Sequence, residues 1–407
     1  MVNAGDTAFV LFSSALVMLM TLGLAFFYGG LVRAKNVLSI IMQCLGLACV
    51  LSLEWILIGY SLSFAPGSAF IGGLKFLGLH GVGGAPNPTY SSSIPHLAFM
   101  LFQGMFAVIT PALIVGAFAE RIKFSAFLLF SILWAVLVYN PVAHWIWGEG
   151  GWLAKLGFID FAGGVVVHLT AGIAAIVMCI LIGKRKGFPE TPMIPHNVPM
   201  VYLGLTLLWF GWFGFNGGSA LAANSVAAYA FVATNTAAAT AGITWALIEW
   251  LTLGAPTTVG TATGAVAGLA AVTPASGFIS PISAIFIGII SACVCFFFVA
   301  VIKPKFGYDD SLDVFGVHGV GGIIGTLCAG LFAQTLVNPS GPNGLFFGNP
   351  HQFIVQLIGV GAAFAYTFVL TLVIGKFVDV VVGLRVSEEE EEMGLDVSQH
   401  KESAYTS

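Results

Sequence analysis

The sequence predicts an all-α protein that crosses a membrane eleven times. Of its 407 residues, 58% are hydrophobic and only 8% are charged, and the mean hydropathy is +0.98. A water-soluble protein of this length would carry far more charge on its surface. The net charge of −4 comes without a basic stripe, which argues against nucleic acid as a partner.

The apolar residues fall in runs that are separated by charged, proline and glycine clusters. A membrane span needs about 20 apolar residues, and eleven runs satisfy this length. The expected spans cover residues 7–31, 37–61, 94–118, 125–144, 162–183, 199–218, 225–250, 257–274, 280–302, 313–333 and 351–383. Residues 65–93, rich in Gly, Pro and Ser, are expected to form an irregular loop. The N-terminus lacks the pattern of a cleaved signal peptide, so the first run is expected to remain as a span.

Lysine and arginine placement predicts the orientation. With the N-terminus outside, twelve of the fourteen Lys and Arg residues fall on the inner side, and only Lys75 and Lys155 fall outside. Positive residues prefer cytoplasmic loops, so we expect an external N-terminus and a cytoplasmic C-terminus. The chain then divides into a membrane domain, residues 1–386, and an acidic tail, residues 387–407. The tail is either an inert solvated segment or one drawn to basic inner loops such as the one with Lys184 and Lys186.

Eleven spans suggest two halves of five with one extra span at the end. Because five is odd, consecutive halves insert with opposite orientations, as in the inverted repeats of many transporters. Asp160-Phe-Ala-Gly-Gly precedes His168 on the fifth span, and Asp313-Val-Phe-Gly precedes His318 on the tenth. We therefore expect the two histidines to be related by the repeat and to lie near the middle of the membrane.

Ionisable residues inside membrane spans are costly and indicate function. His168 and His318 are either unrelated interior histidines, each bonded to a carbonyl, or a facing pair that lines one path. A metal site is not indicated, because no third ligand stands at a suitable spacing. The six cysteines lie in apolar runs and suggest neither disulfides nor a zinc site. No cofactor is expected, and no nucleophile–base set indicates an enzyme.

Polar and aromatic residues gather at the expected outer ends of several spans. Asp160 stands at the start of the fifth span, where it is an N-cap and also a candidate carboxylate for stabilising an arriving cation. Phe106, Trp147 and Phe215 end up on the same side of the membrane, where aromatic faces attract cations by roughly 0.5–2 kcal/mol. Trp147 is equally explained as an interfacial anchor.

The chain contains six specific motifs: FFYGGLVRAKNVLS (26–39), GAFAERIKFSA (116–126), DFAGGVVVH (160–168), GWFGFNGGS (211–219), DVFGVHGVGG (313–322) and VGLRVSEEEEEMGLD (382–396). They resemble motifs of the bacterial Amt proteins in the Amt/Mep/Rh superfamily of ammonium transporters. They occur in the family's order and cover essentially the whole chain. The resemblance implies a multi-pass protein of the cell (inner) membrane that forms a homotrimer with one pore in each subunit.

The resemblance also implies roles for individual residues. Trp147 and Ser219 match the vestibule that recruits the ammonium ion, and Phe106 and Phe215 match the stacked pair that closes the outer end of the pore. Asp160 matches a carboxylate needed for transport that organises the vestibule. The remaining matches line the pore: the paired histidines His168 and His318, and the aromatic walls Trp212 and Phe27.

The expected activity is transport of ammonium, which is deprotonated and crosses the hydrophobic pore as ammonia. Two alternatives remain at this point: an Rh-like channel for neutral ammonia or carbon dioxide, and an ammonium sensor that acts through a cytoplasmic partner. Trp147 and Ser219 favour recruitment of a cation. The resemblance further implies that a PII-type signal protein can bind the cytoplasmic face, where the motif Gly394-Leu395-Asp396 suggests a docked tail.

Overall fold

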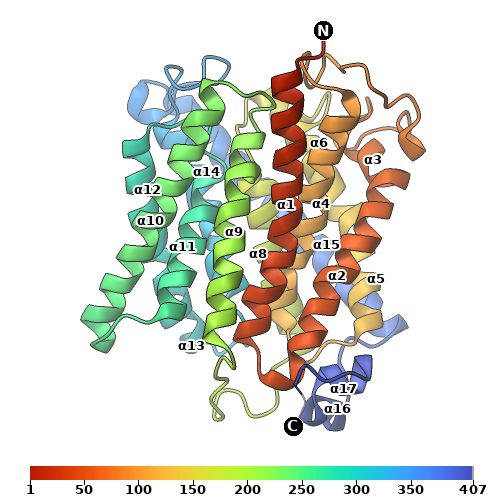
Figure 1. The fold of residues 1–407 in the computed structure, drawn as a ribbon, viewed down its shortest axis with the longest axis vertical. Helices are drawn as coiled ribbons and strands as arrows, with labels where there is room; N and C mark the ends of the chain where they lie inside the picture. The colour runs from red at the N-terminus through yellow and green to blue at the C-terminus, as the bar shows by residue number, and fades with distance from the viewer. Residues whose placement is uncertain (406–407) are drawn as a thin grey trace.

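The computed structural model describes residues 1–405 of the chain. Its helices stand side by side, and the N- and C-termini lie at opposite ends of the bundle (Figure 1). We call these ends the N-terminal face and the C-terminal face. Among the described residues, the only β-structure is three isolated bridges. Ten described helices are long and apolar enough to cross a membrane, and one shorter apolar helix brings the total to eleven. The predicted all-α, multi-span architecture is therefore confirmed.

Five segments make up the first half of the membrane domain. They are α1 (Ala4–Leu31); α2 with η2 and α3 (Val37–Glu54, Trp55–Gly59, Tyr60–Phe64); α4 (His96–Phe118); α5 with η4 and α6 (Phe124–Trp134, Ala135–Tyr139, Asn140–Trp147); and η5 with α8 (Gly164–Leu169, Thr170–Ile182). The η segments inside these spans are π-helical turns. The short helix α7 (Trp152–Leu156) precedes the fifth span.

The second half again contains five segments, and one further helix follows. They are α9 (Val198–Gly218); α10 (Ser225–Leu253); α11 (Thr258–Val272); α12 with η6 and α13 (Pro281–Phe297, Phe298–Ile302, Lys303–Phe306); η7 with α14 (Phe315–Gly319, Val320–Phe332); and the extra helix α15 (Pro350–Val381). The eighth segment, α11, is the short one with 15 residues. Single 3₁₀ turns lie in the loops at Ala34–Asn36 (η1), Leu77–Leu79 (η3) and Leu345–Phe347 (η8).

Helix starts follow the caps that the sequence supplies. The side chains of Asn3, Asn224 and Ser280 each accept a backbone N–H three residues on, at the beginnings of α1, α10 and α12. Pro281 follows Ser280 at the first helical position, where its missing N–H costs nothing. These local signals mark where the chain enters these three spans.

The two halves carry matching irregularities. π-helical turns interrupt the fourth and ninth spans (η4 and η6) and begin the fifth and tenth spans (η5 and η7). The second span contains a further one, η2. Pairing of the fourth with the ninth and of the fifth with the tenth is the correspondence that an inverted five-helix repeat requires.

Large apolar side chains remain exposed along the outside of the bundle. Trp250 and Leu251 on α10, Ile282 on α12, and Phe368 and Val373 on α15 are all exposed. In water such a surface would be an aggregation hazard. It suits a chain whose surroundings are lipid and other protein.

The acidic tail folds into two short helices, α16 (Glu388–Met393) and α17 (Leu395–His400), at the C-terminal face (Figure 1). Ser387 and Glu390 form a capping box that starts α16. Leu395 is fully buried, although the tail shows no apolar periodicity. The tail is therefore packed against the membrane domain and is not simply solvated.

Candidate functional site

A cavity of about 310 Å³ opens at the N-terminal face. Its lining is aromatic and polar, and none of the lining residues is charged: Phe64, Thr89, Tyr90, Phe99, Gln103, Phe106, Ile146, Trp147, Phe161, Ser219 and Leu221. Three of the residues predicted for a vestibule, Phe106, Trp147 and Ser219, thus come together in one cavity. They come from α4, from the end of α6 and from the residue that follows α9.

Hydrogen bonds to the backbone hold the polar groups of this vestibule. The indole Nε1 of Trp147 donates to the Asp160 carbonyl oxygen at 2.8 Å, which fixes the ring. The Ser219 hydroxyl donates to the Phe215 carbonyl oxygen at 2.9 Å. Because that hydroxyl spends its proton on the backbone, its oxygen lone pairs remain able to accept a hydrogen bond from a cation.

Two phenylalanine rings close the bottom of the vestibule. The ring centroids of Phe106 and Phe215 lie 4.3 Å apart with an angle of 36° between their planes, and both side chains are buried. Trp147 stands edge-on to Phe106 at 6.0 Å. The structure therefore brings the predicted gate pair together directly beside the predicted recruiting indole.

Beneath the gate lies a much narrower cavity of about 10 Å³. This is close to the smallest volume that holds one water molecule. Its walls are apolar apart from two imidazoles and one phenol: Met20, Leu24, Phe27, Tyr28, Ile109, Leu113, Val167, His168, Leu208, Trp212, Phe215, Val266 and His318. All four predicted pore-lining residues are among them.

The two histidine rings face one another within this narrow cavity. Their centroids are 5.2 Å apart and their planes are within 15° of parallel. Trp212 lies nearly parallel to His168 at 5.4 Å, and its Nε1 donates to Thr273 Oγ1 at 2.9 Å. Among the described residues, both nitrogens of His168 and Nδ1 of His318 have no hydrogen-bond partner. The interpretation of two histidines bonded to carbonyls is therefore wrong, and the facing pair is the observed arrangement.

Reciprocal glycine contacts set the spacing of the pair. Gly172 follows His168 by four residues and packs on the backbone of Gly319, the residue after His318. In the same way Gly322 follows His318 by four residues and packs on Leu169, the residue after His168, with its backbone nitrogen 2.7 Å from where a Cβ would stand. A side chain at either glycine would push the two histidine-bearing segments apart.

Asp160 caps the π-helical turn that carries His168. Its two carboxylate oxygens accept the backbone N–H groups of Gly163, Gly164, Val165 and Val166 at 2.6–3.2 Å. The N-cap interpretation is correct. The carboxylate is buried and is not part of the vestibule lining, so its contact with the vestibule runs through its own carbonyl and Trp147.

The counterpart of Asp160 in the second half is Asp310, which sequence reasoning missed. Asp310 precedes His318 by eight residues, as Asp160 precedes His168, and its Oδ2 accepts the N–H of Phe315 at 2.8 Å. Burial raises the pKa of Asp310 to about 6. The similar stretches that begin at Asp160 and Asp313 therefore do not make these two aspartates equivalent. The shared eight-residue spacing was the signal that could have identified Asp310.

A third cavity, of about 320 Å³, opens at the C-terminal face. It shares Phe27, Tyr28, Val266 and His318 with the narrow cavity, so the two meet at the second histidine. Unlike the vestibule at the other end, its lining includes charged residues, namely Arg185, Lys303 and Asp313. The three cavities lie in sequence from one face of the molecule to the other.

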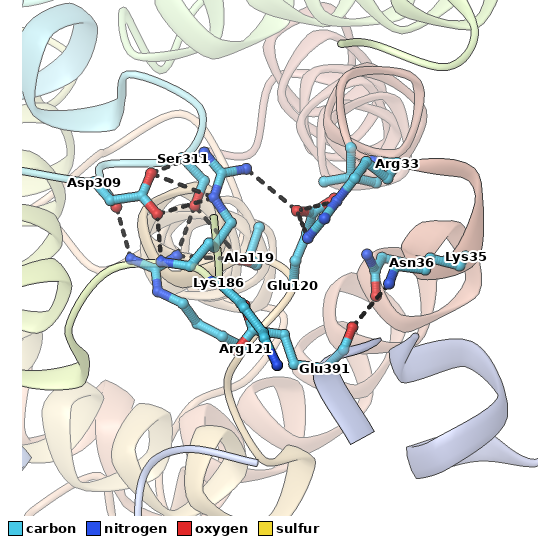
Figure 2. A network of polar contacts seen from close by, with 12 residues as sticks. Arg33, Lys35, Asn36, Ala119, Glu120, Arg121, Lys186, Asp309, Ser311 and Glu391 are labelled. Carbon is cyan, nitrogen blue, oxygen red and sulfur yellow. Dashed lines mark hydrogen bonds and ion pairs between the residues drawn. The ribbon is translucent and has the colours of Figure 1, made fainter. Parts of the chain in front are cut away.

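A buried ionic network surrounds this C-terminal mouth (Figure 2). Glu120 pairs with Arg33 at 2.8 Å and with Arg185 at 3.2 Å, and Arg185 also pairs with Asp309 at 2.8 Å. Burial alone would raise the pKa of Glu120, but the hydrogen bonds and charges of the two arginines outweigh it and hold that pKa below its usual value. Glu120 has a left-handed backbone (φ 73°), which is uncommon outside glycine.

Arg121, next in the chain, is fully buried, and its guanidinium group donates several hydrogen bonds. It donates to the carbonyl oxygens of Ala117, Gly183 and Asp309 and to the hydroxyl of Ser311 at 2.6–3.2 Å. These contacts tie the end of α4 to the end of α8 and to the loop before η7. Residues of the sequence motif GAFAERIKFSA thus connect these three segments at the C-terminal face.

The tail extends this network. Glu391 accepts the Lys186 backbone N–H at 2.7 Å and pairs with Arg385 at 2.7 Å. Asp396 accepts the N–H of Ser39 at 2.8 Å near the start of α2, and the Leu395 N–H donates to Asn36 Oδ1 at 2.8 Å. Lys35, Asn36, Lys186 and Glu391 lie close together in Figure 2. Among residues 1–405, no group of three or more His, Cys, Asp or Glu side chains is placed to hold a metal ion.

Comparison with known proteins gives the chain its family. The model of the ammonium transporter family matches residues 8–405. The chain is 53% identical to an ammonium transporter of Bacillus subtilis over 98% of both chains, and 50% identical to the ammonium transporter Amt1 of Archaeoglobus fulgidus over 99% of both.

Solved structures agree with this assignment. Mep2 of Candida albicans superposes with a TM-score of 0.91 at 39% identity, over 99% of this chain and 91% of Mep2. A protein described as a sensor Amt protein gives a TM-score of 0.89 at 33% identity, over 97% of this chain and 98% of the other. The relatives from Bacillus subtilis and Archaeoglobus fulgidus are named as transporters and not as enzymes. The chain is a multi-pass membrane protein and belongs to the ammonium transporter family.

Proposed function

We propose that this protein binds ammonium ion in the vestibule at its N-terminal face, where the ion loses a proton. Ammonia and the proton then both cross by way of the twin-histidine cavity and recombine at the C-terminal face, so that the net transport is of ammonium ion. The N-terminal face is then external and the C-terminal face cytoplasmic, as the distribution of lysine and arginine predicts. The observation that carries the proposal is the narrow apolar cavity between two larger ones, with His168 and His318 as its polar groups.

The energetics of desolvation select the form that crosses. Trp147, Phe106 and Ser219 offer an ammonium ion aromatic faces and a hydroxyl oxygen, which are together worth a few kcal/mol at most. Transfer of an intact ion into an apolar cavity costs many kcal/mol more. Potassium cannot lose its charge, whereas ammonium can lose a proton and enter as a neutral molecule. The gate of Phe106 and Phe215 supports this selection because the cavity beneath it has no room for a hydration shell.

The histidine pair offers the neutral molecule its polar partners. Ammonia donates and accepts hydrogen bonds, and the imidazole nitrogens of His168 lack partners within the described part of the protein. A neutral imidazole presents one donor and one acceptor. Two facing imidazoles can therefore hold ammonia in a cavity whose other walls, Trp212 and Phe27 among them, are apolar or aromatic.

Current recording on reconstituted protein tests the proposal. An ammonium jump should give a saturable current, methylammonium a smaller one, and potassium none. Phe215→Ala, which opens the gate, should admit a potassium current, whereas Phe213→Ala, on the same helix but outside the cavity lining, should not. Uptake of ammonia without any current would favour the neutral gas channel instead.

Assembly and partners are further proposals. The exposed apolar side chains of the bundle support a homotrimer, in line with the family resemblance. The tail packed on the loop at Lys186 supports a docking surface at the C-terminal face for a PII-type protein. Chemical cross-linking in membranes tests the first, and binding of purified PII-type protein with and without residues 387–407 tests the second.

A further inference from the structure

The C-terminal mouth contains an ion pair that the proposed pathway does not use. Lys303 Nζ lies 2.6 Å from Asp313 Oδ1, and both residues line the 320 Å³ cavity together with His318. The side chains are 17% and 26% exposed, so the pair lies at the cavity wall and not in open solvent. Asp313 stands five residues before His318, and its carbonyl oxygen accepts the Val317 N–H at 2.9 Å, so the carboxylate sits at the foot of the histidine-bearing segment.

Arg185, the other charged residue of this cavity, already has partners in the buried ionic network. Arg185 donates to both carboxylate oxygens of Asp309 and also pairs with Glu120. Lys303 and Asp313 are therefore the charged groups of the cavity that lie outside that network. Asp313 has a left-handed backbone conformation (φ 61°).

The group that binds the Asp313 carboxylate is the side-chain ammonium group of Lys303. A lysine side chain ends in an ammonium group, with a unit positive charge and N–H donors like those of the free ammonium ion. The 2.6 Å contact shows that this carboxylate accepts an ammonium group in the geometry of a strong charge-assisted hydrogen bond. The position is reached from the same cavity into which the twin-histidine segment opens.

We propose that Asp313 is an ammonium-ion site at the cytoplasmic mouth and that Lys303 occupies it as a built-in competitor. The inference rests on the proposed function and orientation and extends them to the exit. Ammonia that leaves His318 combines in this cavity with the proton that crossed with it and becomes a cation beside a carboxylate. With Lys303 paired to that carboxylate the product is released, and ammonium from the cytoplasm finds the site filled.

The expected signature is an opposite response to the removal of each partner. Lys303→Met keeps the length of the side chain and removes its charge, which exposes Asp313. The half-saturating ammonium concentration on the cytoplasmic side should then fall roughly fivefold, as loss of one competing ion pair would allow. The maximal rate should fall with it, because an exit site that binds product more tightly releases it more slowly.

Asp313→Asn should act in the other direction. It leaves the charge of Lys303 unpaired at the mouth, so the half-saturating concentration on the cytoplasmic side should rise above that of the wild type. Asparagine tolerates the left-handed backbone at this position. The double variant Lys303→Met/Asp313→Asn should return close to the wild type, since it removes both site and competitor.

The experiment measures ammonium chloride currents in right-side-out and inside-out membrane vesicles that contain the full-length protein. Lys305→Met is the matched control, because Lys305 lies two residues away beside Phe306 and does not line the cavity. It should leave both sides unchanged.

The outcomes separate this inference from the function on which it rests. If wild-type vesicles give no saturable ammonium current, the proposed function is wrong. If the wild type transports but Lys303→Met leaves the cytoplasmic half-saturating concentration unchanged, Asp313 is not a masked ammonium site. Should Lys303→Met fail to assemble, the rise expected for Asp313→Asn decides the question, and a fall or no change there overturns the inference.

Discussion

The two mouths of the pathway differ in how they are built. The N-terminal mouth is lined by aromatic rings and neutral polar groups, among which Trp147 and Ser219 each donate one hydrogen bond to the backbone. The C-terminal mouth is framed by a buried network of Arg33, Glu120, Arg185 and Asp309, onto which the tail packs. Similar cavity volumes thus open through very different chemistry.

This difference indicates that the N-terminal mouth selects the ion and that the C-terminal mouth holds segments of the chain together. Neutral aromatic groups bind a cation weakly and let it go, which suits a site that hands its ion onward. A buried ionic network is strongly destabilised when one partner is removed, which suits a joint that must hold several segments in register. We therefore expect variants at the N-terminal mouth to change transport and variants of the buried ionic network at the C-terminal mouth to change stability first.

Asp160→Ala is the variant with the largest expected effect. It leaves four buried backbone N–H groups without an acceptor, each costing about 1–3 kcal/mol. The turn that carries His168 should lose its shape, and ammonium flux should disappear. Flux assays and trimer yield in detergent measure both effects. Asp160→Asn, which keeps part of the cap, should retain more flux than Asp160→Ala; normal transport by Asp160→Ala would contradict the role given to this carboxylate.

His168→Ala and His318→Ala should abolish ammonium transport or its selectivity while the protein remains folded. Each removes a polar partner of ammonia from an otherwise apolar cavity. Ammonium, methylammonium and potassium currents, with thermal unfolding as the stability check, test this. Matched variants of His144, a histidine bonded to the Ser63 and Ser68 carbonyls outside these cavities, should lower stability without admitting potassium. Unchanged flux and selectivity in both pore variants would reduce the pair to packing residues.

Glu120→Gln tests the buried ionic network at the C-terminal mouth. It leaves Arg185 short of one partner in a buried site, a loss of about 3–5 kcal/mol for an uncompensated buried charge. The pKa of Glu120 is lowered in the folded protein, so its ionic contribution is complete at neutral pH and is lost only as pH falls below the usual carboxylate range. Thermal unfolding of wild type and variant should therefore differ at pH 7 and converge in acid. A variant as stable as the wild type at pH 7 would argue against the joint.

Trp147→Leu should have a moderate effect confined to recruitment. Loss of about 0.5–1 kcal/mol of cation–π attraction corresponds to a roughly two- to fivefold rise in the half-saturating ammonium concentration on the external side. The maximal current should change less. Trp250→Leu, on the exposed side of α10, is the control. A change in maximal current alone would place Trp147 in packing rather than in recruitment.

The tail should give the smallest effect on the pore itself. Truncation after Val386 should leave the spans and trimer intact, reduce activity and weaken binding of a PII-type protein. Glu391→Gln removes one buried contact to Arg385, whereas Glu389→Gln, on the exposed side of α16, is the control. Hydrogen exchange of the Lys186 amide should quicken only in the first variant. Equal flux and equal partner affinity with and without the tail would contradict the proposal.

Much of the fold could be predicted because membrane spans are determined by local composition. Apolar runs of sufficient length identify the spans, including α11, whose helix is only 15 residues long. The aromatic gate and the twin histidines were identified through motifs, and the structure places them in adjoining cavities. The residues that sequence reasoning missed or misassigned are those whose role depends on contacts distant in the chain.

Asp310 and Glu391 illustrate this limit. Asp310 stands beside Asp309 and close to Asp313. Only its eight-residue distance from His318, and not its immediate neighbours, tells this capping carboxylate from the two that pair with Arg185 and Lys303. Glu391 is one of five consecutive glutamates, yet it alone of the five is buried, because of contacts with Lys186 and Arg385. In a run of identical residues, the sequence alone does not indicate which residue contacts another part of the protein.

The reciprocal contacts of Gly172 and Gly322 bear on how transport responds to temperature. Each glycine interlocks one half of the chain with the residue after the histidine of the other half. The two halves therefore cannot rock against one another without pulling the imidazoles apart. A carrier that rocks must cross a conformational barrier in every cycle and slows steeply on cooling. Flux through this protein should instead decrease only slightly as temperature falls, as passage through a fixed pore does. The two imidazoles should keep their facing arrangement at low temperature.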